Sequence, residues 1–137
     1  MRTGVAFAIG VVAACASCRA PTAADDGRVA AGLWGGDHVR VEVTRAGATL
    51  EYDCAHGTID EPLVADATGR FSLKGSHTFE HGGPIRVDEQ LERHPARYDG
   101  RADGGTLRFT VTVTDLGREV GAFMVSLGAQ PRLVKCL

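Results

Sequence analysis

The sequence predicts an all-β fold, most simply a single small antiparallel up-and-down barrel of about eight strands. Apolar and polar residues alternate with a period of two over much of the region 37–137, which is typical of antiparallel strands with one buried face. Turns that contain glycine recur between the alternating segments. No segment beyond the N-terminal apolar run shows the period of an amphipathic helix.

Strands are expected at residues 38–45, 48–55, 57–65, 70–79, 94–102, 105–114, 119–127 and 132–136. Alternation is clearest on four apolar faces: Val39, Val41 and Val43; Ala48, Leu50, Tyr52 and Cys54; Leu107, Phe109, Val111 and Val113; Gly121, Phe123, Val125 and Leu127. The turn signals between strands lie at residues 46–47, 66–69, 103–105, 115–117 and 128–131. Because most connections are short, consecutive strands should pair as antiparallel neighbours around the barrel.

The N-terminus carries one basic residue, Arg2, followed by an apolar run at residues 5–14 that ends at Cys15. This run has the length of a secretory signal and is too short to span a bilayer as a mature helix. Its end, Val12-Ala13-Ala14-Cys15, resembles the lipobox of bacterial lipoproteins, in which the cysteine becomes the lipidated N-terminus. The resemblance implies export, a lipid anchor in the membrane, and a location in the cell envelope facing the periplasm or the exterior.

Two alternatives to lipidation at Cys15 remain open. Cys18 is the alternative anchor, because cleavage there would remove Cys15 and leave Cys54 and Cys136 as one pair. Ordinary secretion with a small-residue cleavage site is the other. In the preferred interpretation, residues 1–14 are the signal peptide, residues 15–31 a flexible tether of small and polar residues, and residues 32–137 the barrel domain.

The charge balance argues against nucleic acid as a partner. The chain has 15 lysines and arginines against 17 acidic residues, a net charge of −2, and no basic cluster is visible along it. Catalysis is not expected either: the serines follow strand patterns without a nucleophile elbow, no carboxylate pair stands out, and the Gly82-Gly83-Pro84 segment precedes no helix. No catalytic residue is assigned, and no cofactor is expected.

The expected strand directions place all five histidines at one end of the barrel. Extending the alternation gives inward parity to four of them, unless a bulge at Gly75 reverses it for His77 and His81. The candidate ligand or metal rim at this end comprises His56, His77, His81, His94, Trp34 and Tyr98. Neutral imidazoles there could hold a transition metal, helped by Asp60, Glu61 or Glu80. The alternative is that polar residues simply cap the barrel mouth. Neighbouring imidazoles should also depress one another's pKa values, unless Glu80, Asp60 or Glu61 offsets or reverses the shift.

Cys54 and Cys136 should lie at this same end and form a disulfide, because export implies an oxidising compartment. Two buried free thiols are the alternative. With strand 38–45 between them, the two cysteines would be about 9–10 Å apart, whereas a disulfide needs Cα atoms within about 7 Å. The bridge therefore requires the barrel to narrow there, or the first strand to begin above that level.

The segment Gly32-Leu33-Trp34 ahead of the first expected strand resembles the lipocalins and the wider calycin group. In that group the tryptophan closes one barrel end and a basic residue late in the chain packs over it, a role that would fall to Arg132. The chain is shorter than a typical lipocalin and its turns are tight, which disfavours a roomy ligand cup. Size, export and a single disulfide also resemble the small calycin-type inhibitors of secreted metalloproteases, which act through an N-terminal segment such as residues 23–32.

The preferred functional hypothesis is a non-enzymatic, lipid-anchored envelope protein whose small β-barrel is a binding or structural module for a protein or small-molecule ligand. A calycin-type inhibitor of a secreted protease is the first alternative, and a metal-binding protein using the histidine rim is the second.

Overall fold

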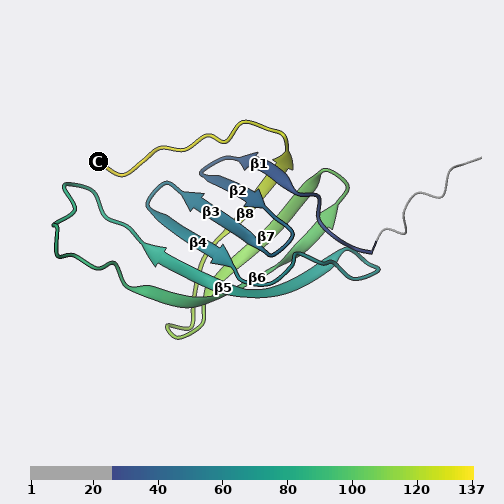
Figure 1. Ribbon diagram of the computed structural model, residues 1–137, viewed down its shortest axis with the longest axis horizontal. Helices are drawn as coiled ribbons and strands as arrows, with labels where there is room; N and C mark the ends of the chain where they lie inside the picture. The colour runs from purple at the N-terminus through teal and green to yellow at the C-terminus, as the bar shows by residue number, and fades with distance from the viewer. Residues whose placement is uncertain (1–25) are drawn as a thin grey trace, which may run out of the picture.

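Eight antiparallel strands follow one another around a closed barrel in the computed structural model, which describes residues 26–137 (Figure 1). The strands are β1 (Gly32–Gly36), β2 (Val39–Val43), β3 (Ala48–Tyr52), β4 (Ala55–Ile59), β5 (Arg70–Phe79), β6 (Arg93–Asp103), β7 (Thr106–Val113) and β8 (Arg118–Leu127). Strand β1 pairs with both β2 and β8 and so closes the sheet. The all-β up-and-down barrel is confirmed. The proposed signal peptide, Cys15 and Cys18 lie outside the described residues.

The expected strand 38–45 is present as β2, but a strand before it was missed and the expected last strand, 132–136, is absent, so the total of eight is unchanged. The chain enters the barrel at β1, which contains Trp34, and the segment 132–136 forms only a single bridge between Asp37 and Arg132. Three of the five residues of β1 are glycine, so the strand carries no alternation that could reveal it. Since β1 occupies the place between β2 and β8, no sheet edge is left there for a strand at the C-terminus.

The barrel interior is filled by side chains. Its largest fully buried residues are Trp34, Tyr98, Leu107 and His77. The indole Nε1 of Trp34 donates a hydrogen bond to the carbonyl of Ala30 at 3.0 Å, which satisfies its one polar atom. The inward faces of the strands therefore form a packed core, as alternation predicts for a small barrel.

Residues just before β1 pair with a loop segment that follows β4. Val29 donates its backbone N–H to Leu63 at 2.9 Å, and Ala65 donates to Gly27 at 2.7 Å. A bridge between Arg28 and Val64 lies between these two hydrogen bonds. The sequence assigned this segment to the tether, and the structure instead has it hydrogen-bonded to the barrel domain.

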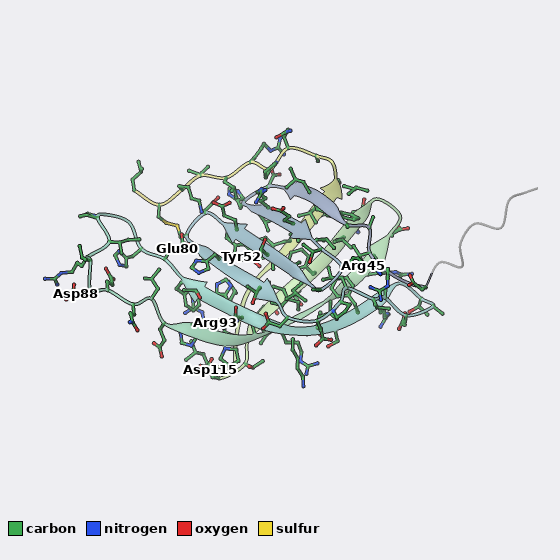
Figure 2. The ribbon with its side chains drawn as sticks, viewed as in Figure 1. Arg45, Tyr52, Glu80, Asp88, Arg93 and Asp115 are labelled. Atoms are coloured by element: carbon green, nitrogen blue, oxygen red, sulfur yellow. A yellow bond between two sulfur atoms is a disulfide. The ribbon has the colours of Figure 1, made fainter. Side chains whose placement is uncertain are left out.

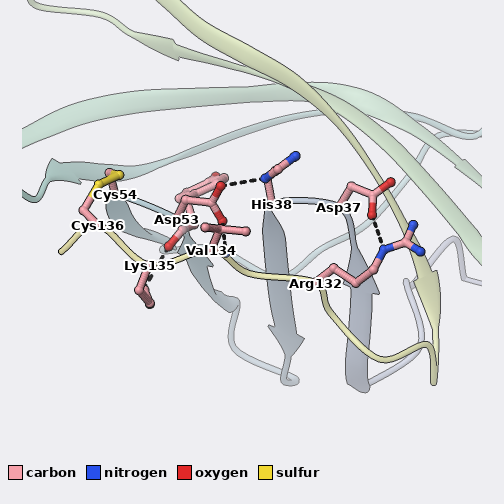
Figure 3. A network of polar contacts seen from close by, with 9 residues as sticks. Asp37, His38, Asp53, Cys54, Arg132, Val134, Lys135 and Cys136 are labelled. Atoms are coloured by element: carbon pink, nitrogen blue, oxygen red, sulfur yellow. Dashed lines mark hydrogen bonds and ion pairs between the residues drawn. A yellow bond between two sulfur atoms is a disulfide. The ribbon is translucent and has the colours of Figure 1, made fainter.

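The C-terminal tail, residues 132–137, crosses one end of the barrel and is held there by several contacts (Figure 3). The disulfide between Cys54 and Cys136 is confirmed, with Cα atoms 5.4 Å apart. Asp53 accepts a hydrogen bond from the N–H of Val134 at 2.7 Å, and its other oxygen pairs with His38 at 2.6 Å. The Val134 N–H, and then the His38 and Lys135 charges, lower the pKa of the Asp53 carboxyl.

The expected spacing problem between the two cysteines does not arise, because the tail is not a strand. It leaves the sheet after β8, hydrogen-bonds to the turn between β1 and β2 through Arg132, and then reaches the turn between β3 and β4. The exposed Arg132 guanidinium pairs with Asp37 (Figure 3). The expectation that Arg132 packs over Trp34 is therefore wrong: the tail that carries Arg132 runs over the barrel end, where Asp37 is the nearest acidic partner.

Candidate functional site

The strand directions place all five histidines at one end of the barrel, as expected. His77 on β5 lies opposite His94 on β6, and both side chains are buried. His56 and His81 lie outside, with about half of each side chain exposed (50% and 49%). Inward parity is thus confirmed for His77 and His94 and wrong for His56 and His81.

The two errors have different local causes. Strand β4 begins at Ala55, whose side chain is buried, so His56 faces outward and pairs with Glu80 at 2.6 Å. His81 follows the end of β5 in a loop, where its ring contacts Glu89 and the carbonyl of Gly82. The alternation of buried and exposed residues does not continue through the turn before His56 or past the end of the strand before His81. Figure 2 shows Glu80 at the end where β5 finishes.

Within residues 26–137 no group of three or more histidine, cysteine, aspartate or glutamate side chains is arranged to hold a metal ion. His94 is instead paired with Asp115, whose Oδ2 lies 2.9 Å from Nδ1. Tyr98 is also inside the barrel, where its hydroxyl donates to the carbonyl of Ser76 at 2.7 Å. With Trp34 and Tyr98 in the core, the candidate rim is divided between the interior and the outer surface.

His77 is the unusual residue of the interior. It is fully buried (0% exposed), and neither ring nitrogen has a hydrogen-bond partner. Its ring packs against Tyr52 and Phe79, with centroids 5.3 and 4.8 Å away. The Tyr52 hydroxyl points into the barrel and also has no partner among the described residues (Figure 2). This end of the core is therefore a cluster of neutral rings rather than a charged site.

Burial lowers the pKa of His77, and the charges of His56, His94 and Arg118 lower it further. The expected depression is thus confirmed for His77. It is wrong for His81, whose pKa is raised by the Gly82 carbonyl and by Glu89. The sequence-based expectation assumed mutual repulsion between imidazoles, whereas the nearest groups to the exposed His81 are hydrogen-bond acceptors.

Replacing His77 by phenylalanine should remove a pH-dependent loss of stability. A depressed folded-state pKa means that the stability contribution is complete above the unfolded value of about 6.5. It falls as pH drops through that value toward the lower folded-state pKa. His77→Phe should lose this fall, and at pH 8 it should be at least as stable as the wild type, because an apolar ring replaces two unpaired nitrogens.

Urea denaturation of the wild type and His77→Phe at pH 8 and pH 5 measures the effect. His56→Gln is the matched control, because this exposed histidine lies at the same barrel end. It should retain most of the wild-type fall, since burial is the main cause of the lowered His77 pKa and the His56 charge only adds to it. If His77→Phe keeps the full pH dependence of stability, His77 is not the source of that dependence.

A hollow of about 880 Å³ lies on the outer face of β5 to β8. Two neighbouring rows of outward-facing residues shape it, each in register across the four strands. One row has long side chains: Arg70, Arg101, Arg108 and Met124. The other has shorter ones: Ser72, Asp99, Thr110 and Ala122. The difference in length between the rows leaves a groove, which we call the β5–β8 groove.

Sequence reasoning missed the β5–β8 groove, because its residues are far apart along the chain. One signal was available: Arg101 and Arg108 are nearly symmetric about the turn at 103–105, so a hairpin places them side by side. The position of Arg70 beside Arg101 depends on the register between β5 and β6, which a long loop separates. The folded surface therefore has a basic cluster, although none is visible along the sequence.

No family model, curated protein or solved structure matches this chain. No helix within residues 26–137 is long and apolar enough to cross a membrane.

Proposed function

We propose that this protein is a non-enzymatic, lipid-anchored protein of the cell envelope whose barrel binds its ligand on the outer face. One observation supports the location of the binding site: the barrel interior is filled by side chains, while the β5–β8 groove is open. A volume of about 880 Å³ lies within the range of small-molecule sites in proteins. The Val12-Ala13-Ala14-Cys15 segment supports the anchor.

The protease-inhibitor alternative requires an available N-terminal segment, which the sequence located at residues 23–32. Residues 27–29 are hydrogen-bonded to 63–65. A protease would have to engage the remainder of that segment or displace these contacts. A ligand in the β5–β8 groove does not have to displace these contacts, so binding on the outer face is the preferred function.

The anchor is tested by replacing each candidate cysteine in the full-length chain. Wild-type protein should partition with membranes and carry the mass of a lipid, and Cys15→Ser should do neither. Cys18→Ser is the matched control and should remain lipidated. Full lipidation of Cys15→Ser would move the anchor to Cys18, and a wild type without lipid would contradict the anchoring proposal.

The groove is tested by NMR titration of the ¹⁵N-labelled chain with phenol, benzoate and phenyl phosphate. At least one probe should shift backbone amides on the groove rows of β5 to β8. Ala122→Trp, which fills the groove from an exposed position, should abolish the shifts. Shifts centred instead on Trp34 and Tyr98 would contradict outer-face binding and place the ligand in the barrel interior.

A further inference from the structure

Three arginines lie side by side on the β5–β8 groove. Arg70 is the register partner of Arg101, and Arg101 is the register partner of Arg108. Neighbouring strands are about 4.8 Å apart, so the row spans about 10 Å. All three side chains are exposed. Like charges directly across a strand pair destabilise a sheet, so such a row carries an energetic cost in the absence of a counter-charge.

The described residues supply only part of the counter-charge. Hydrogen bonds with Thr68 and Arg70, and the Arg70 charge, lower the pKa of the Asp66 carboxyl, but no ion pair forms with the Arg70 guanidinium. Arg28, Arg40, Arg93 and Arg132 each have a carboxylate oxygen within 4.0 Å, whereas none of the three groove arginines does. No guanidinium of the row donates a hydrogen bond to a side chain or a carbonyl of residues 26–137 either. The row therefore presents three planar guanidinium groups, each a fork of N–H donors, to the groove.

The two carboxylates that line the groove, Asp66 and Asp99, accept hydrogen bonds from groups other than the three guanidiniums. One oxygen of Asp66 accepts hydrogen bonds from the Thr68 N–H at 2.8 Å, the Thr68 hydroxyl at 2.6 Å and the Arg70 N–H at 3.0 Å. Asp99 accepts from the Ser72 hydroxyl at 2.5 Å, and Ser72 in turn accepts from Arg97 at 2.7 Å. Asp66 thus stabilises the loop before β5, and Asp99 stabilises the row that contains Ser72.

We propose that the β5–β8 groove binds a phosphate ester, with its phosphate on the row of Arg70, Arg101 and Arg108; this rests on the proposed function. Guanidinium groups bind phosphate through paired N–H···O bonds. A phosphate monoester offers three terminal oxygens, which suits three forks better than the two oxygens of a carboxylate. The half-exposed Met124 ends the same outward-facing row, so the apolar part of the ester lies against its side chain.

The ester has two sources with the same chemistry, a soluble phosphate monoester and phosphatidic acid, a lipid whose headgroup is a phosphate monoester. For the soluble arm, the full-length chain is titrated with phenyl phosphate and with phenol, followed by NMR. Phenyl phosphate should bind more tightly than phenol, and added salt should weaken only the phosphate-dependent part. For the lipid arm, full-length Cys15→Ser, which lacks the proposed anchor, is sedimented with phosphatidylcholine vesicles that contain or lack phosphatidic acid.

Arg70→Gln, Arg101→Gln and Arg108→Gln should each weaken binding about fivefold, the upper effect of an exposed ion pair. Arg40→Gln is the matched control: it removes the same charge from the outer face of β2, which lies across the closed barrel from β6, and should leave binding unchanged. Arginine-dependent binding to vesicles that contain phosphatidic acid identifies a lipid headgroup. Arginine-dependent binding of phenyl phosphate without vesicle binding identifies a soluble ester.

Two outcomes overturn the inference in distinguishable ways. Equal shifts with phenol and phenyl phosphate, unchanged in all three glutamine variants, would contradict phosphate binding while leaving outer-face binding intact. If phenol, benzoate and phenyl phosphate all leave the groove amides unshifted, both the inference and the proposed binding site are wrong.

Discussion

Removing the disulfide between Cys54 and Cys136 is expected to lower the free energy of unfolding by about 4–5 kcal/mol in the chain-entropy model. The two cysteines are 82 residues apart, so the bridge closes most of the barrel into one covalent loop. Opening that loop gives the unfolded chain many more conformations, which favours unfolding. Such a loss is a large fraction of the stability of a small domain.

Urea denaturation of Cys54→Ser/Cys136→Ser and of the wild type, each with and without a reducing agent, measures this effect. Reduction should destabilise the wild type and leave the double variant unchanged, which separates the bridge from other effects of the reagent. Equal stability of the oxidised wild type and the double variant would contradict the assigned contribution.

The disulfide also holds the tail in place. It lies beside the contacts of Asp53 with Val134 and of Lys135 with the Tyr52 carbonyl, at 2.7 and 2.9 Å. Without the bridge, only non-covalent contacts retain the tail, among them these two, the Arg132 contacts with Gly36, Asp37 and His38, and the Lys135–Glu51 ion pair. Amide hydrogen exchange at Val134 and Cys136, whose N–H groups both donate to Asp53, should therefore accelerate in the double variant.

Trp34→Ala is expected to lower the free energy of unfolding by about 3–5 kcal/mol, the usual cost of deleting a large buried aromatic side chain. Trp34 is 1% exposed and is the only large inward side chain of β1, since three of that strand's five residues are glycine. Strand β1 closes the barrel between β2 and β8. A cavity at this position therefore weakens the closure as well as the core.

Trp34→Phe is the matched variant, because it retains an aromatic ring and removes the hydrogen bond to Ala30. It should be clearly more stable than Trp34→Ala, which keeps the prediction testable if the alanine variant fails to fold. Urea denaturation followed by far-UV circular dichroism measures both. Wild-type stability in Trp34→Ala would show that the closure does not depend on this side chain.

The fold class could be predicted because its signals are local. Val111 and Val113 on β7 alternate with threonines, and a glycine-containing turn separates β7 from β8. A period of two and a turn residue act over a few neighbouring positions, so each can be seen without knowing the partner strand. The strand β1 could not be found in this way, because Gly35 and Gly36 next to Trp34 carry no pattern.

The candidate site was predicted only in part, for a related reason. His77 and His94 lie within strands whose phase is unbroken, and their burial follows from alternation. His56 and His81 lie beyond turns, where one residue more or less reverses the face of the sheet. Similarly, a bulge near Val111 shifts the pairing of β7 and β8, which alternation along either strand does not reveal.

The sequence by itself determined the barrel class, most of the strand positions and the pairing of Cys54 with Cys136, because alternation, turns and cysteine number are properties of the chain. Only the tertiary structure decided the path of the tail, the outward position of His56 and the row of Arg70, Arg101 and Arg108. The physical reason is that the arginine row depends on the register between strands, and the other two features depend on the geometry of a turn and of the chain after the last strand. Register is set by packing and by the geometry of each connection, and the pattern within one strand is compatible with several registers.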